Sequence, residues 1–127
     1  KTSYRSMNIF TWLILGHLVG DWMFQNDWMA RGKQRQLFNK EILVHCLVYT
    51  AVLALTLWIA THDQALSPPY LTILAIIFLS HWLIDAGNLA GLWMRWWRQS
   101  RVLFVRIMVD QTMHMVVLAA LVEWWLT

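Results

Sequence analysis

The chain has 127 residues, a length that suits one domain. Hydrophobic residues make up 59% of it and charged residues only 13%, about half the charged share of an ordinary soluble domain. The net charge of +3 is modest, and the basic residues lie in short segments beside apolar runs, which favours membrane-topology signals over a nucleic-acid surface. The composition therefore predicts an integral membrane protein that contacts the lipid bilayer and has no nucleic-acid partner.

Four apolar runs predict four helices, at about 9–28, 42–60, 70–94 and 102–126. Each run approaches the ~20 residues that a helix needs to cross the hydrocarbon core. The basic segment 29–41, which contains Lys33, is expected to be an exposed loop. Pro68 and Pro69 end the turn at 61–69, because proline is excluded from a helix interior. The expected fold is all-α: an integral membrane four-helix bundle in a single domain, 1–127.

The distribution of Trp, Lys and Arg predicts an orientation. Several of the ten Trp lie near the ends of apolar runs, as in the aromatic belts at membrane interfaces. Lys and Arg are concentrated in 29–41 and 95–101, so the positive-inside rule assigns both loops to the cytoplasm and the 61–69 turn to the outside. Both chain ends then lie outside, provided that all four runs span the membrane.

Ionisable residues recur within the apolar runs as pairs spaced by four: His17 with Asp21, His81 with Asp85, and Asp110 with His114. This spacing puts the two members of a pair on one helix face, a turn apart. The order reverses in the last run, where the chain direction is also reversed. Every Asp is therefore expected nearer the cytoplasm and every His one turn deeper, with His45 of the second run on the same side.

Charged groups at such depth are costly and normally face a bundle interior or a wet cavity. A cation among the carboxylates would keep them ionised, and mixed His and Asp donors suit Zn²⁺, Mn²⁺ or Fe²⁺. We therefore predict one or two divalent metal ions. The candidate ligands are His17, Asp21, His45, His81, Asp85, Asp110 and His114. Two alternatives stay open: a polar network that only pins the bundle, and a proton or ion pathway.

Four further polar residues lie beside these pairs. Gln25 follows Asp21 by one turn, Gln111 adjoins Asp110, and Asn88 lies three residues after Asp85. All three are candidates for positioning a substrate, although interhelical hydrogen bonds would also explain them. Arg106 lies one turn before Asp110 and could pair with it, extend to the interface or bind a phosphate.

These motifs carry a resemblance. The series comprises His17-x3-Asp21-x3-Gln25-x-Asp27-Trp28-Met29, Lys33, His45, His81-x3-Asp85 and Asp110-Gln111-x2-His114. It resembles the bacterial and phage membrane family called domain of unknown function 3307, over nearly the whole chain. The resemblance implies a multi-pass protein of the bacterial inner (cytoplasmic) membrane and no particular activity. The chain is also somewhat similar to membrane-bound metal-dependent hydrolases, which alone suggests hydrolysis.

The leading hypothesis is an intramembrane metal site that hydrolyses a lipid or a phosphorylated substrate. The metal would activate water, Asp85 and Asp110 would be the catalytic carboxylates, and Gln25, Asn88, Gln111 and Arg106 would position the substrate. A second hypothesis is a structural or accessory subunit that associates with itself or with other membrane subunits and ligates a pigment or haem. A third is a proton-coupled or ion-coupled carrier.

Overall fold

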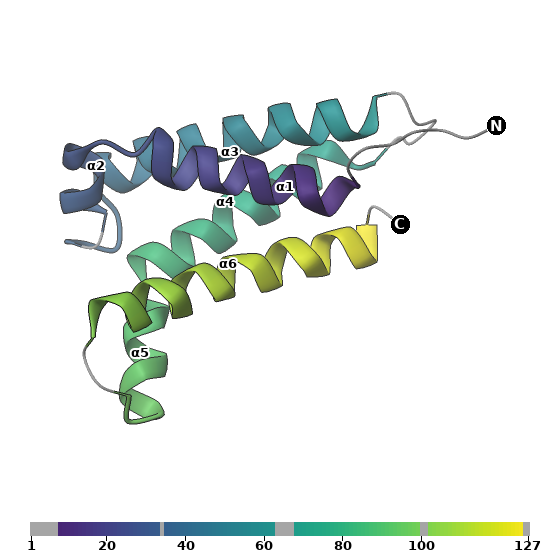
Figure 1. The fold of residues 1–127 in the computed structure, drawn as a ribbon. Coiled ribbons are helices and arrows are strands. Elements are labelled where there is room, and N and C mark those ends of the chain that lie inside the picture. The colour runs from purple at the N-terminus through teal and green to yellow at the C-terminus, as the bar shows by residue number, and fades with distance from the viewer. Residues whose placement is uncertain (1–7, 34, 63–67, 100–101, 126–127) are drawn as a thin grey trace.

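The computed structural model describes residues 8–33, 35–62, 68–99 and 102–125 (Figure 1). They form the helices α1 (Ile9–Leu18), α2 (Asp27–Gly32), α3 (Lys40–Thr61), α4 (Tyr70–Ala86), α5 (Leu89–Trp96) and α6 (Leu103–Trp125), with a π-helical turn, η1 (Val19–Met23), after α1. No strand occurs among these residues, so the prediction of an all-α chain is confirmed. Residues 63–67 of the expected outer turn, and Arg101 of the second basic loop, lie outside the described ranges.

The four long helices form a closed ring. Helix α1 contacts α3 and α6, and α4 contacts the same two helices from the other side. The chain runs back and forth along the molecule, and α2 and α5 lie at the same end of it (Figure 1). The described parts of the two basic segments therefore lie at one end, because one segment begins within α2 and the other within α5.

The first apolar run is interrupted where a single helix was expected from 9 to 28. The amide of Phe24 donates to the carbonyl of Val19 at 3.0 Å, five residues back, which widens the last turn and ends it. Helix α2 then starts afresh, because the side chain of Asn26 accepts from the amide of Met29 at 2.9 Å. Asn is a preferred N-cap residue, and Asn39 caps α3 in the same way. Asp21 therefore lies in a π turn, a feature often found at functional sites.

The third run is also divided. Helices α4 and α5 meet at an angle of 54°. The residue at the bend, Asn88, has a left-handed backbone with φ 50° and caps α5 through its side chain. Asn tolerates this conformation better than most residues, so it permits a sharp change of direction here. The expected helix at 70–94 is therefore a long helix followed by a short one that turns aside.

The half of the ring away from α2 and α5 is an apolar core. The buried side chains of Leu13, Leu53, Ile77 and Leu118 bring one residue from each long helix into it. Close approach of α1 to α3 depends on Gly16, since a Cβ there would lie 2.6 Å from a methyl group of Leu53. The polar residues of the pairs gather at the other half of the ring.

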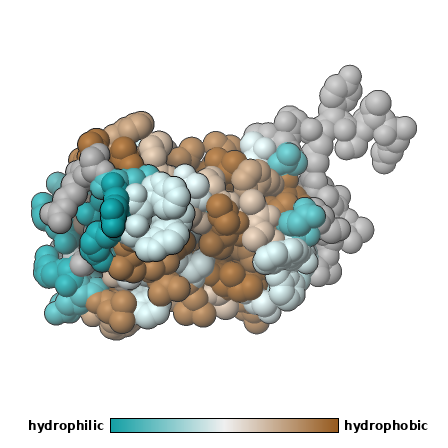
Figure 2. Space-filling view, turned by 90° about the horizontal axis from the view of Figure 1, so that it is seen from below, coloured by the Kyte–Doolittle hydropathy of each residue, from teal (hydrophilic) through white to brown (hydrophobic). Residues whose placement is uncertain are grey.

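Within the described part of the chain, two helices, α3 and α6, are long and apolar enough to cross a membrane, and α4 with α5 forms a third candidate if the bent pair is one span. Helix α1 with η1 is apolar but shorter. Large apolar side chains are exposed along the long helices, for example Leu55, Leu79 and Val116. Figure 2 shows an apolar band across the middle of the visible face, with polar residues gathered toward the end that carries α2 and α5. This surface suits association with a membrane.

We expect Gly16→Leu to lower the free energy of unfolding by about 1–3 kcal/mol, because the added side chain overlaps Leu53 and Thr56 and forces α1 away from α3. The measurement is thermal or denaturant unfolding in detergent. Ala51→Leu is the matched control, since Ala51 lies on α3 with an exposed side chain. Equal stability of the two variants would contradict close packing at Gly16.

Candidate metal centre

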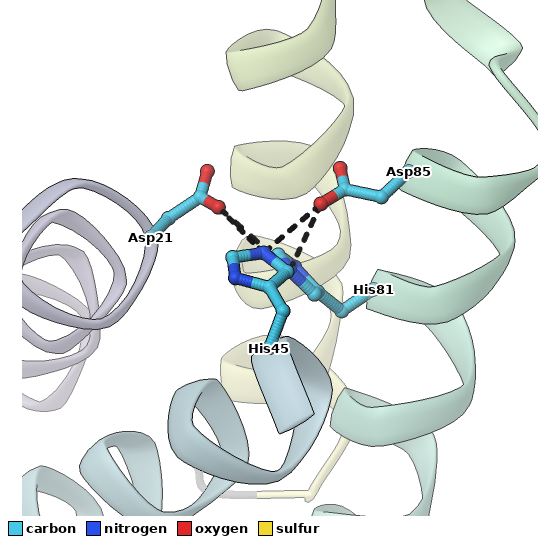
Figure 3. A group of neighbouring side chains, drawn as sticks. All are labelled: Asp21, His45, His81 and Asp85. Atoms are coloured by element: carbon cyan, nitrogen blue, oxygen red, sulfur yellow. Dashed lines mark hydrogen bonds and ion pairs between the residues drawn. The ribbon is translucent and has the colours of Figure 1, made fainter. Parts of the chain in front are cut away.

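Four buried side chains from three elements converge at the polar half of the ring: Asp21 from η1, His45 from α3, and His81 and Asp85 from α4 (Figure 3). One donor atom from each lies within 4.8 Å of every other. The Nε2 atoms of His45 and His81 are 2.8 Å apart. Oδ2 of Asp85 lies 3.1 Å from the first nitrogen and 3.2 Å from the second. We call these four residues the first donor group.

The spacing of the first donor group suits a small divalent cation. Ligands of a tetrahedral ion with bonds of about 2.0–2.1 Å lie about 3.3 Å from one another. The Oδ1 atom of Asp21 completes the set, at 3.1 Å from Nε2 of His45 and 3.8 Å from Nε2 of His81. This oxygen is buried, and its nearest partners are the imidazole of His45 and, at 4.0 Å, the ammonium of Lys33. A buried carboxylate is costly unless it is paired, and a cation would pair with it closely.

A second donor group consists of Asp85, Asp110 and His114, whose donor atoms also lie within 4.8 Å of one another. It brings α6 to the cluster, and it shares Asp85 with the first group. Asp85 and His114 are buried, whereas the side chain of Asp110 keeps 17% of its surface exposed. Six of the seven candidate ligands therefore fall into two groups that could hold a metal ion.

His17 belongs to neither group. Its Nδ1 lies 2.7 Å from the hydroxyl of Tyr49, and its Nε2 hydrogen-bonds Oε1 of Gln111. Both ring nitrogens of His17 therefore already have partners, and Nε2 also lies 3.8 Å from Oδ2 of Asp21 at the edge of the first donor group. The i, i+4 pairing expected for His17 and Asp21 is therefore present at this distance, although the π turn begins between the two residues.

Tyr49 is a residue that the sequence analysis missed. Its ring stacks on His81 with centroids 3.7 Å apart and planes 14° apart. Nδ1 of His81 has no hydrogen-bond partner among the described residues, so this stacking fixes the ring in place of the hydrogen bond usual for a metal-binding histidine. A signal was present, because Tyr49 follows His45 by four residues and therefore shares its helix face.

Lys33 also lies at the site, although the sequence did not indicate this. The expectation that Lys33 lies in an exposed loop is wrong. Helix α2 ends at Gly32 and directs Lys33 inward. Its Nζ lies 3.2 Å from Oδ2 of Asp85 and 4.0 Å from Oδ1 of Asp21, and 15% of the side chain is exposed. Burial lowers the pKa of the Lys33 ammonium, but the carboxylates of Asp85 and Asp21 outweigh burial and hold that pKa above its ordinary value.

The four candidates for substrate positioning lie at the cluster and at the bend between α4 and α5, and Arg106 lies at both places. Gln111 bridges the cluster: its amide nitrogen donates to Asp21 at 3.1 Å and to Asp110 at 3.2 Å. Gln25 is partly buried near the same carboxylates. Arg106 donates to the side chain of Asn88 at 2.8 Å, which ties α6 to the bend between α4 and α5.

A cavity of about 460 Å³ opens beside the cluster, between η1, α2 and α6. Its polar lining consists of Asp21, Gln25, Lys33, Arg106, Asp110 and Gln111. A second cavity of about 380 Å³ adjoins it and shares Arg106. A small solute or a polar head group therefore has room to reach the edge of both donor groups.

Residues 9–127 match the model of a family described as "Protein of unknown function (DUF3307)". The chain belongs to this family. The match covers every residue of the cluster, so the family resemblance inferred from the motifs is confirmed. No curated protein and no solved structure matches the chain.

We expect Lys33→Met to lower the free energy of unfolding of chelator-treated protein by about 3 kcal/mol, because Asp21 and Asp85 lose a buried cationic partner. The folded-state pKa of Lys33 is raised, so its contribution is complete below the ordinary pKa of 10.5 and is lost as the pH rises through the higher folded value. Unfolding in detergent, measured against pH, tests both points.

Lys40→Met is the control for this substitution, since Lys40 is exposed at the start of α3. Added Mn²⁺ should restore part of the stability that Lys33→Met loses, because a second cation then faces the same carboxylates. Equal stability of both lysine variants at neutral pH would contradict the role of Lys33.

Proposed function

We propose that this chain is a multi-pass inner-membrane protein with an intramembrane divalent-metal site, and that it hydrolyses a phosphorylated substrate with a lipid portion. The observation that carries the metal is the approach of two imidazole nitrogens, His45 Nε2 and His81 Nε2, to 2.8 Å between two carboxylates. Burial of these groups without a cation would leave carboxylate oxygens unsatisfied. A mixed His and Asp donor set suits Zn²⁺, Mn²⁺ or Fe²⁺.

The charges of the cluster support the same conclusion. The carboxylates of Asp21, Asp85 and Asp110 face the ammonium of Lys33, and the guanidinium group of Arg106 lines the same cavity, so the site keeps a net negative charge when the histidines are neutral. A divalent cation offsets this charge. Such compensation is favoured in a bundle whose sides face hydrocarbon, where isolated charge is costly.

The proposed membrane placement follows from the apolar band and the polar end. With α3 and α6 as spans and the bent pair as a third, the polar end that carries α2 and α5 lies at the cytoplasmic face. The basic residues there fit the positive-inside rule. Helix α1 with η1, about 22 Å long at 1.5 Å per residue, crosses most of the hydrocarbon core. The cavity then opens at the level of lipid head groups.

The mechanism we propose uses the cavity beside the metal. A bound divalent ion would polarise the substrate oxygen and lower the pKa of a water molecule. Asp21 and Asp110 both belong to a donor group and line the cavity, but only Asp110 of the two keeps part of its side chain exposed, so Asp110 would accept the proton when the water oxygen bonds to phosphorus. The bond from phosphorus to the ester oxygen breaks, and that oxygen takes a proton from solvent. Lys33 and Arg106 line the cavity and would hold the phosphate oxygens.

A lipid portion is supported by a long apolar groove of about 770 Å³ between α4, α5 and α6, lined by residues such as Leu83, Trp93, Phe104 and Met108. Phe104 and Met108 lie on α6 on either side of Arg106 in the chain, so groove and polar cavities adjoin the same helix. A substrate with a phosphate head and an acyl chain would suit both. Asp85 is fully buried and does not reach the cavity, so we propose that it acts as a metal ligand and not as a carboxylate that contacts the substrate.

The alternatives fit less well. A carrier needs a route from the cluster to the opposite face, whereas the described residues there pack as an apolar core around Leu53 and Ile77. A haem held between His45 and His81 would need the flat porphyrin to pass between atoms 2.8 Å apart, which is closer than van der Waals contact allows.

Elemental analysis of detergent-purified protein tests the metal. We expect bound divalent metal in the wild type and its loss from the first donor group in His81→Ala, while His62→Ala, whose histidine is exposed at the far end of α3, keeps the wild-type content. Chelation should lower the midpoint of thermal unfolding of the wild type. A wild type that binds no divalent metal after purification or dialysis against Mn²⁺ would overturn the proposal.

Hydrolysis is tested with phosphatidic acid in mixed micelles and with a water-soluble aryl phosphate, by release of inorganic phosphate with Mn²⁺ present. We expect Asp110→Asn to lower the rate on the lipid by about 10²-fold or more, because the proton acceptor is lost. His62→Ala should keep the wild-type rate. Metal binding without release of phosphate from either substrate would leave the metal site standing and reject this reaction.

A further inference from the structure

A hydrogen bond from His114 to the backbone determines which ring nitrogen carries the proton and which one is left to face the cluster. Nδ1 lies 2.8 Å from the backbone carbonyl of Asp110, and a carbonyl oxygen only accepts, so Nδ1 carries the proton. In the neutral ring Nε2 then presents a lone pair. This atom is buried without a hydrogen-bond partner among the described residues and lies 3.5 Å from Oδ1 of Asp85. The lone pair of His114 Nε2 and the carboxylate oxygen Oδ1 of Asp85 thus face each other in the protein interior.

The two oxygens of Asp85 face different groups. Oδ2 approaches His45, His81 and Lys33 at 3.1–3.2 Å. Oδ1 faces His114 instead, and it also has no hydrogen-bond partner among the described residues. The side chain is fully buried, so water does not satisfy Oδ1 from outside. A carboxylate arranged in this way can bind one cation through each oxygen.

We propose that the cluster holds a second divalent cation between Asp85 Oδ1, His114 Nε2 and the carboxylate of Asp110, with Asp85 bridging the two ions. This inference rests on the first ion of the proposed function and adds a site to it. Ions that share a bridging carboxylate in hydrolytic centres lie about 3.5–4 Å apart, which matches donor groups that share one residue. The donors again suit Mn²⁺, Fe²⁺ or Zn²⁺.

The second position differs from the first in its access and its charge. Three protein donors leave coordination positions free, and Asp110 is the donor that also lines the cavity. The first ion already offsets the negative charge of the carboxylates, so a second ion makes the cluster positive. An anion entering from the cavity restores the balance, and a phosphate group has the charge and the several oxygens to contact both ions. Phosphate should therefore tighten binding of the second ion.

Metal stoichiometry of the full chain in detergent separates this inference from the proposed function. After dialysis against Mn²⁺ we expect two ions per wild-type chain and one in His114→Ala, whose first donor group is intact. One ion in both proteins would overturn the second site and leave the proposed function standing. No ion in the wild type would overturn both. Asp110→Asn gives a second route to the same loss if His114→Ala fails to fold.

Electron paramagnetic resonance of the Mn²⁺-loaded wild type tests whether Asp85 bridges the two ions, because bridged Mn²⁺ ions are exchange-coupled. We expect a signal from two exchange-coupled ions, changing in His114→Ala to that of an isolated ion, while His62→Ala stays coupled. Titration with Mn²⁺ alone and with Mn²⁺ plus inorganic phosphate should show at least about tenfold tighter binding of the second ion with phosphate, about 1.4 kcal/mol. Two ions without coupling would exclude Asp85 as the bridge.

Discussion

Neutralisation of buried carboxylates is the constraint on which the rest of this molecule depends. Three Asp side chains meet inside a ring of apolar helices, where a lone charge is costly. Histidine nitrogens, the ammonium of Lys33 and the side-chain amide of Gln111 contact these carboxylates and stabilise their charge. These groups come from every part of the chain, so the cluster binds η1, α2, α3, α4 and α6 to one another. The apolar core in the other half of the ring keeps the helices close enough for this to happen.

The parts of the fold that follow from periodicity could be predicted from the sequence. Each apolar run is helical, and the pairs His81 with Asp85 and Asp110 with His114 meet because a regular helix puts residues four apart on one face. The reversed order in the last run also indicated correctly that α6 runs against α4 (Figure 1). The assignment of catalytic and substrate-positioning roles remains a prediction.

What could not be predicted depends on breaks in periodicity. The π turn that carries Asp21 inserts an extra residue into a helix, and the local spacing of residues in the sequence does not predict this turn. The place of Lys33 depends in turn on the start of α2 after Asn26, and on the hydrogen bond that the side-chain nitrogen of Asn39 donates to the carbonyl of Gly32 at 2.7 Å. A lysine in a basic segment is expected to be exposed to solvent. Its burial here depends on the path of the chain, which the local sequence does not show. Tyr49, by contrast, was within reach of the spacing argument.

The bend at Asn88 links the surface of the molecule to its interior. Helix α5 turns away by 54° and exposes Trp93 and Trp96, side chains that prefer the boundary between lipid and water. Asn88 at the hinge is bonded to Arg106, and Arg106 lines both polar cavities. In the proposed membrane placement, a tilt of α5 in response to the thickness or the packing of the surrounding lipid would therefore also move the guanidinium group. That placement would give the bilayer a mechanical route to the shape of the chamber that a substrate would enter.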